Sequence, residues 1–240
     1  MGRIFEKRKD RMFARWSKMS KAFTKIGREI AIAVRLGGPS PATNSRLRMA
    51  MQNARSVNMP KDRVDSAILK ASTKSDAIMD EAFYEAYGPG GVGIYIEAAT
   101  DNPTRTIANI RMVINKYGGN MATSGALDFV FKRQGIFRIA MPTGDIDELE
   151  LDLMDFGLED MFETEEGDLL IYTTFSGFGE VQKYLESKGH ELKSAGLQRT
   201  PLTYAETSEE NIALVNKMIS VLEDDDDVQS VYHNLQDHEE

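Results

Sequence analysis

The sequence predicts an α+β protein in which a basic helical domain precedes two domains that alternate strands and helices. Three observations predict this fold. Apolar residues recur with the helical period up to about residue 70, the period changes after residue 83, and a polar stretch separates the two regions. A chain of 240 residues is also long enough for two or three domains.

The first predicted element is a helix over residues 18–36. Its apolar residues recur at spacings of three and four and therefore share one face: Met19, Phe23, Ile26, Ile30 and Val34. Lysines and arginines fall on the opposite face. The pair Gly37-Gly38 ends the helix, because glycine tolerates the left-handed conformation that follows a helix.

Two shorter helices complete a predicted bundle. Asn44 is suited to cap a helix that runs through Ala54, and Pro60 is suited to the first turn of a helix that continues to Ile68. Residues 1–16 carry six basic side chains. This segment is expected to be either a free arm that orders on nucleic acid or an extension of the first helix.

After a linker at residues 72–82, strand and helix patterns alternate. One set in the order β-α-β-β-α-β covers residues 136–140, 145–156, 158–163, 168–174, 179–188 and 191–195. The flanking segments complete a second set: 92–97, 103–117, 127–132, 198–204, 208–222 and 228–233. The simplest interpretation is two ferredoxin-like domains, one inserted in the other. The predicted domains are residues 1–75, residues 83–133 with 197–240, and the inserted residues 134–196.

Charge is divided unevenly along the chain. Residues 1–75 hold 18 Lys+Arg and 5 Asp+Glu, whereas the remaining 165 residues hold 11 and 33, so a segment of net charge +13 precedes one of −22. This asymmetry is typical of a basic nucleic-acid-binding module on an acidic body; a charged face that only keeps the protein soluble is the alternative. The predicted nucleic-acid-binding residues are Lys18, Lys21, Lys25, Arg28, Arg35, Arg46, Arg48, Arg55, Lys61 and Arg63.

The acidic region is expected to contact protein or to orient the basic end, because its charge repels phosphate. Its densest acidic run is Glu223–Asp227. This run lacks the spaced oxygens and the glycine turn of a calcium loop, so a solvated helix end is expected there.

Residue types for catalysis and metal binding are scarce. The chain has no cysteine, and its three histidines lack ligand-like spacing. The Gly-rich stretch before Val92 has no GK[ST] ending, and Asp101, Glu85 and His190 are expected to have structural roles. We therefore predict a non-enzymatic protein without catalytic residues, metal, cofactor or small-molecule substrate. The absence of an apolar leader or membrane-length segment predicts a cytoplasmic location without membrane contact.

Several separated motifs resemble those of the YebC family. They include Arg35-Leu36-Gly37-Gly38, Asn44-Ser45-Arg46-Leu47-Arg48 and Asn58-Met59-Pro60-Lys61, together with the glycine-rich and helix-start motifs at residues 84–92 and 100–106. The resemblance spans nearly the whole chain and implies a helical domain followed by two α/β domains. One departure is Gly2-Arg3-Ile4-Phe5-Glu6, where many members have Gly-His-Ser-Lys-Trp, so no role of that histidine or tryptophan is carried over.

The resemblance implies a transcriptional regulator, in a family that includes a mitochondrial translational activator. The first expectation is therefore a DNA-binding transcriptional regulator. A translation factor that binds ribosomal or transfer RNA, or the ribosome, is the alternative, and a protein-binding adaptor is the third interpretation. Lysine and arginine contact the phosphates of DNA and RNA alike, so the sequence leaves the choice open.

Overall fold

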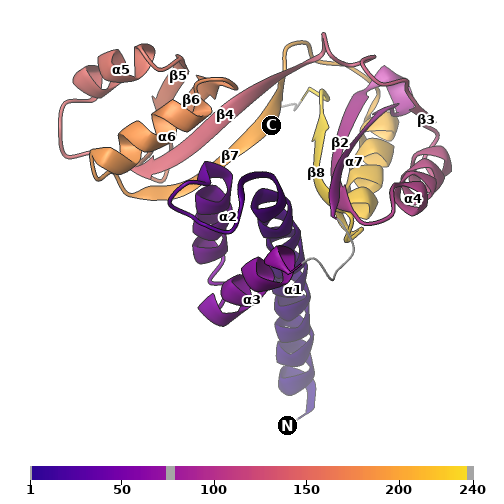
Figure 1. The fold of residues 1–240 in the computed structure, drawn as a ribbon. Coiled ribbons are helices and arrows are strands. Elements are labelled where there is room, and N and C mark those ends of the chain that lie inside the picture. The colour runs from indigo at the N-terminus through magenta and orange to yellow at the C-terminus, as the bar shows by residue number, and fades with distance from the viewer. Residues whose placement is uncertain (1, 74–78, 237–240) are drawn as a thin grey trace.

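The computed structural model describes residues 2–73 and 79–236, with side chains from residue 19 onward. Three helices form the N-terminal region: α1 (Gly2–Gly37), α2 (Ser45–Ser56) and α3 (Lys61–Ser72). Residues 2–16 are the first turns of α1, which settles the alternative between arm and helix in favour of a helix. In Figure 1 this half of α1 projects beyond the rest of the molecule.

The later part of the apolar face predicted for α1 is buried in the bundle, whereas Met19 is exposed and Phe23 is half-buried. Ile26, Ile30 and Val34 pack with Leu47 of α2 and Val64 of α3. The predicted helix stop is confirmed as well. Gly38 has a φ of 81°, and its N–H donates to the carbonyl of Val34 at 2.8 Å.

The first sheet is antiparallel and has the strand order β3-β1-β2-β8. Its strands are β1 (Asp80–Tyr87), β2 (Gly93–Thr100), β3 (Asn120–Met121) and β8 (Val228–His233). A short 3₁₀ helix, η1 (Pro89–Gly91), joins β1 to β2. Helices α4 (Pro103–Lys116) and α7 (Glu209–Glu223) pack on one face, where Ile94 and Ile96 meet Ile110, Ile114 and Met218.

The second sheet is also antiparallel, with the order β5-β6-β4-β7. Its elements follow the chain as β4 (Phe131–Ala140), α5 (Ile146–Met154), β5 (Leu158–Glu163), β6 (Asp168–Thr174), α6 (Phe178–Ser187) and β7 (Leu192–Pro201). This is the β-α-β-β-α-β arrangement that the sequence predicts. Its core includes Phe137 of β4, whose ring stacks on Phe178 of α6 at a centroid distance of 4.7 Å. The α+β class is therefore confirmed.

Two of the predicted strand assignments are wrong. Segments 127–132 and 136–140 are not separate strands, because residues 131–140 form the single strand β4. Segments 191–195 and 198–204 likewise merge into β7, which pairs with β4 over nearly its whole length. Gly135 and Gly196 interrupt the apolar pattern, which predicts strand ends at these positions. Both residues nevertheless lie within the paired part of β4 and β7. The predicted boundaries after residues 133 and 196 fall inside these strands.

The first sheet contains a strand, β1, that the sequence does not predict. The predicted segments 127–132 and 198–204 do not form strands of this sheet. Strand β1 begins within the predicted linker and lies between β3 and β2. Glu81 and Glu85 obscure its apolar pattern because both are acidic, yet Glu85 is buried. Figure 1 shows the helical region below and between the two sheets, with β4 and β7 running from one α/β unit toward the other.

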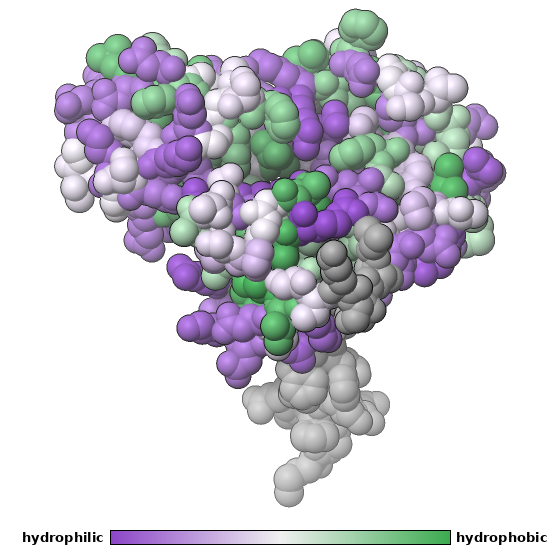
Figure 2. All heavy atoms as spheres, in the orientation of Figure 1, coloured by the Kyte–Doolittle hydropathy of each residue, from purple (hydrophilic) through white to green (hydrophobic). Residues whose placement is uncertain are grey.

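Figure 2 shows how residue types are distributed over the same face of the molecule. Hydrophilic residues predominate over both α/β units, whereas hydrophobic residues gather where the helices meet them. Met49 of α2 belongs to the core of the second sheet, so the helical region is packed against the rest of the protein.

Candidate nucleic-acid interface

Asn44 holds the end of α1 against the start of α2. Its Oδ1 accepts the N–H of Leu47 at 3.0 Å as the N-cap of α2. Its Nδ2 donates to the carbonyls of Ala33 at 2.7 Å and Gly38 at 2.8 Å. A Cβ at Gly37 would lie 2.7 Å from the Asn44 side chain, so glycine is required for this close approach. The basic side chains of the two helices are thus held in a fixed relation.

Two predicted cations on α1 face the acidic C-terminal part of the chain. Lys21 Nζ lies 2.6 Å from Asp224 Oδ1, just beyond the end of α7. Lys25 Nζ lies 3.4 Å from the carbonyl oxygen of Gln229 in β8, and burial lowers the pKa of Lys25. Both side chains therefore contact the first sheet or its flanking helix.

Asp227 is a buried acceptor for the helical region. Its Oδ1 lies 2.6 Å from Nη1 of Arg28, and its Oδ2 accepts from Arg105 at 2.9 Å and from Thr106 at 2.7 Å. Arg28 also donates to the carbonyl of Ala99 at 2.7 Å. Burial opposes ionisation of Asp227, but the hydrogen bonds from Arg105, Arg28 and Thr106 outweigh it and lower its pKa to about 2.

The expectation of a solvated helix end at Glu223–Asp227 is therefore wrong for part of the run. Asp224 is exposed but paired with Lys21, and Asp227 is only 4% exposed. Spacing along the chain could not reveal this, because the partners lie about 200 residues earlier in the sequence.

The cations at the junction of α1 and α2 contact the start of β1. Arg35 pairs with Asp80, and Arg46 pairs with Glu81 through two hydrogen bonds. A bidentate arginine–carboxylate pair fixes orientation as well as distance. These contacts hold α2 over the edge of the first sheet.

Arg48 extends this contact to the second sheet. Its Nε lies 3.3 Å from Glu186 of α6, and its Nη1 donates to the carbonyl of Pro41 at 2.8 Å. Gln52, one turn further along α2, donates to the carbonyl of Leu192 in β7. Six of the ten predicted residues thus contact acidic side chains or backbone carbonyls within the protein: Lys21, Lys25, Arg28, Arg35, Arg46 and Arg48.

Three of the remaining predicted residues lie together at the end of α2 and the start of α3. Arg55, Lys61 and Arg63 are exposed, and among the described residues no carboxylate pairs with them. The side chain of Lys18 lies outside the described residues. Lys70, which the sequence analysis did not select, is also exposed on α3.

A groove of about 350 Å³ lies between α1 and α3. It is lined by Phe23 and Met59, together with Arg63, Ser66 and Lys70. The guanidinium of Arg63 lies 5.8 Å from the centroid of the Phe23 ring. Exposed cations beside hydroxyl and aromatic groups can contact both phosphates and bases. We name Arg55, Lys61, Arg63 and Lys70 the α2–α3 basic face.

Two residues weighed for catalysis have structural partners. Glu85 accepts the N–H groups of Gly125 and Leu127, both at 2.7 Å, and Asp101 pairs with Arg105 at 2.9 Å. The cap of α4 is Asn102, not Asp101: the Asn102 side chain accepts from the N–H of Arg105.

No cluster of histidine, aspartate and glutamate suited to a metal ion occurs in residues 2–73 and 79–236. Over the same described part of the chain, every helix is too short or too polar to cross a membrane.

Comparisons with known proteins agree with this architecture. The N-terminal domain model of the TACO1/YebC protein matches residues 3–74, and the model of the TACO1/YebC second and third domain matches residues 79–235. A protein of Flavobacterium johnsoniae named a probable transcriptional regulatory protein is 50% identical over 99% of this chain and 100% of its own length. A protein of the same name from Myxococcus xanthus is 47% identical over 98% of this chain and 100% of its own.

A solved structure has the same fold. The crystal structure of a conserved hypothetical protein from Aquifex aeolicus superposes with a TM-score of 0.79 at 36% sequence identity. The match covers 92% of this chain and 91% of the Aquifex aeolicus chain. On the domain models, the full-length relatives and the shared fold, this chain belongs to the TACO1/YebC family.

Proposed function

We propose that the protein is a non-enzymatic, cytoplasmic regulator of gene expression that binds nucleic acid through the α2–α3 basic face and the projecting half of α1. The observation that carries the proposal is the separation of charge. A region of net +13 is attached to a region of −22, and within the basic region Arg55, Lys61 and Arg63 are left exposed and without carboxylate partners among the described residues. The names of the curated relatives support a regulatory role.

The proposed interface differs from the full set of ten residues that the sequence suggests. Lys21, Arg28 and Arg46 are engaged in ion pairs, so phosphate would have to displace carboxylates to reach them. Arg55, Lys61 and Arg63 meet no such competition from the carboxylates that the structure describes. The first half of α1 adds Arg3, Lys7, Arg8, Lys9, Arg11 and Arg15, which the sequence places on a helix that projects from the body.

We propose DNA as the target, in agreement with the names of the relatives, so that the protein acts as a transcriptional regulator. The experiment is crosslinking of the protein to nucleic acid in cells, followed by sequencing of the recovered DNA and RNA. Enrichment of promoter DNA would support transcriptional control. Enrichment of ribosomal or transfer RNA would instead make the protein a translation factor, and recovery of neither would favour a protein-binding adaptor.

The matched variants place the interface. Arg55→Glu, Lys61→Glu and Arg63→Glu together should strongly reduce crosslinking, because they reverse three exposed charges. The control combines Arg111→Glu, Lys116→Glu and Lys217→Glu, which reverse three exposed cations on α4 and α7. Equal loss in both triple variants would show that net charge alone matters and would reject the α2–α3 basic face as the interface.

A further inference from the structure

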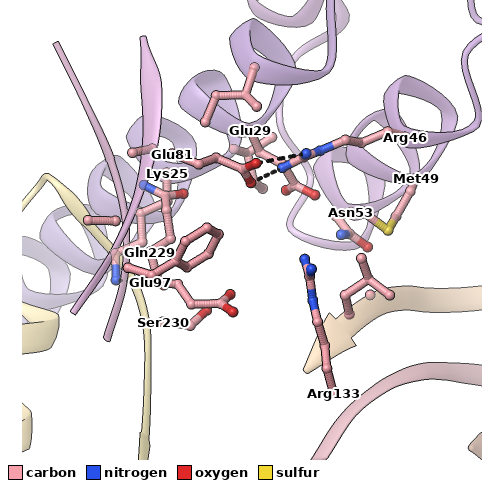
Figure 3. A pocket seen from close by; sticks show the side chains of 17 residues that line it. Lys25, Glu29, Arg46, Met49, Asn53, Glu81, Glu97, Arg133, Gln229 and Ser230 are labelled. Atoms are coloured by element: carbon pink, nitrogen blue, oxygen red, sulfur yellow. Dashed lines mark hydrogen bonds and ion pairs between the residues drawn. The ribbon is translucent and has the colours of Figure 1, made fainter. Parts of the chain in front are cut away.

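A cavity of about 260 Å³ lies where the helices meet both sheets (Figure 3). Its walls come from α1 and α2 on one side and from β1, β2, β4, β7 and β8 on the other. A single water needs only about 10–15 Å³ of such a volume, so the cavity can hold an organic molecule.

Arg133 of β4 points into this cavity toward Asn53 of α2 (Figure 3). Its Nε is fully buried and has no hydrogen-bond acceptor among the described residues. The guanidinium is held beside the ring of Phe175, 4.3 Å from the ring centroid. Burying a donor without an acceptor costs about 1–3 kcal/mol, and more when the group is charged. This arrangement suits an acceptor supplied by a ligand.

The strand register is a second indication that Arg133 takes its acceptor from a ligand. Arg133 lies directly opposite Arg199 in the β4–β7 ladder, and like charges in that position destabilise a strand pair. Arg199 is compensated, because its Nε lies 3.2 Å from Glu97 and its guanidinium lies 3.6 Å from the ring centroid of Tyr95. No carboxylate among the described residues lies within ion-pair distance of Arg133.

The charges around the cavity favour an anion. Arg46 pairs with Glu81, and Glu97 pairs with Arg199. Beyond these two pairs, the charged lining residues are two cations, Lys25 and Arg133, and one carboxyl, Glu29; Arg199, the partner of Glu97, does not itself line the cavity. Burial raises the pKa of Glu29 to about 7, so this carboxyl is partly protonated at neutral pH. Counted together with Arg199, which pairs with Glu97 from outside the lining, the groups around the cavity are four cations against three carboxyls, so the balance is slightly positive.

The rest of the lining suits a planar, partly polar body. Ile26, Ile32 and Met49 provide apolar walls, and the ring of Phe83 lies among the lining side chains. The amide Nε2 of Gln229 is buried and lacks an acceptor among the described residues. Amide groups and aromatic rings are the groups with which proteins contact nucleic-acid bases.

We propose that this cavity binds a nucleoside monophosphate unit, with its phosphate on the guanidinium of Arg133 and its base between the apolar walls. The planar fork of arginine matches two phosphate oxygens at once. The unit comes either from a free nucleotide or from the 5′-terminal nucleotide of a single strand. The site is separate from the α2–α3 basic face and does not depend on nucleic-acid binding there.

The test is calorimetric titration of the full chain with AMP, GMP, CMP and UMP. Inorganic phosphate and a short single strand with and without a 5′-phosphate complete the set. Saturable binding of at least one monophosphate is expected, with inorganic phosphate at least tenfold weaker. Binding of the 5′-phosphorylated strand alone supports the site with a strand end as the source. Equal binding of inorganic phosphate and nucleotides, or binding of none of the probes, overturns the proposal.

Variants of opposite expected sign locate the site. Arg133→Gln should weaken binding at least tenfold, whereas Glu97→Gln should strengthen it, because it removes a negative charge that faces the ligand. Arg111→Gln, an exposed arginine on α4, is the matched control and should leave affinity unchanged. A thermal unfolding curve for each variant shows that it is folded. Should folded Arg133→Gln bind as the unaltered protein does, the assignment to this cavity is refuted.

Discussion

Arg28 and Asp227 are 199 residues apart in the chain and form an ion pair with an N–O distance of 2.6 Å. Their side chains are 18% and 6% exposed, less than those of the other ion pairs that join the helices to the α/β part among the described residues. The pair therefore connects α1 to the start of β8 in a place that water hardly reaches.

A double-mutant cycle should show that this pair is coupled. Arg28→Met and Asp227→Asn should each lower the free energy of unfolding by about 2–4 kcal/mol, because the first leaves buried Asp227 with Arg105 as its one remaining counter-charge among the described residues and the second leaves Arg28 with none. The coupling energy from urea denaturation should be about 1–3 kcal/mol. The cycle for Lys21 and Asp224, a more exposed pair, should give at most about 1 kcal/mol. Equal coupling in the two cycles would contradict the role of burial.

The pH dependence of the same pair has a defined sign. The pKa of Asp227 is lowered to about 2 in the folded protein, so its contribution to stability is complete above the unfolded-state pKa of about 4. That contribution should be lost as the pH falls from about 4 toward 2. Asp227→Asn should show a smaller loss of stability over this interval in urea denaturation at each pH.

Two triple variants should separate stability from nucleic-acid binding. Arg55→Gln, Lys61→Gln and Arg63→Gln remove exposed charges, so the free energy of unfolding should change by at most about 0.5 kcal/mol per site. Binding to duplex DNA should weaken, and the slope of log K against log salt should fall by up to about 2.7, since each lost phosphate contact removes about 0.9. Fluorescence anisotropy across a salt series measures both quantities.

The comparison variant carries Lys21→Gln, Arg28→Gln and Arg46→Gln, which remove three paired cations. This variant should have a lower free energy of unfolding and should keep most of the slope of log K against log salt. The opposite pattern, in which this variant loses the slope and stays stable, would place the interface on the paired cations.

Glu29 should make stability depend on pH near neutrality. Burial raises the pKa of Glu29 to about 7, an effect that Arg46 and Asn53 partly offset. Because the folded state holds this proton more tightly, the stabilisation is complete below about pH 4.5 and is lost as the pH rises through 7. The resulting change in the free energy of unfolding is at most about 3.5 kcal/mol, because raising a pKa by one corresponds to about 1.4 kcal/mol.

Glu29→Gln removes this titration while keeping the shape of the side chain. The variant should therefore gain stability relative to the unaltered protein between pH 5 and pH 8, as measured by denaturant midpoints. An exposed glutamate, Glu163→Gln on β5, should show no such change. Parallel pH profiles for the unaltered protein and Glu29→Gln would be inconsistent with a raised pKa.

Asn44→Ala should destabilise the helical region. The substitution removes the N-cap bond to Leu47 and the bonds to two carbonyls near the end of α1. We expect a loss of about 2–3 kcal/mol, made up of a cap and buried hydrogen bonds. Thr43→Ala, at an exposed neighbouring position, should cost less than about 0.5 kcal/mol in the same denaturation experiment.

The sequence predicts the elements that depend on local signals. The cap at Asn44, the stop at Gly37-Gly38 and the β-α-β-β-α-β order of the second sheet all follow from neighbouring residues or from short-range periodicity. Strand β1 was not predicted, because its acidic residues indicate an exposed segment. Glu85 is in fact buried, and its carboxylate accepts the N–H groups of Gly125 and Leu127, about 40 residues later in the chain.

The candidate site was predicted in composition but not in arrangement. The basic region is evident from charge, yet the division into paired and unpaired cations depends on where Asp224, Asp227, Asp80 and Glu81 fall in the fold. The cavity around Arg133 could not be predicted, because it is formed by strands from both sheets and by two helices.

The separation of 199 residues between Arg28 and Asp227 also orders events during synthesis. At translation rates of about 5–20 residues per second, the carboxylate that covers Arg28 is made about 10–40 seconds after the arginine itself. Strand β8, which completes the first sheet, comes equally late. Each newly made chain therefore passes through a period in which its basic helices exist without their acidic partners, beside the RNA-rich particle that is producing them.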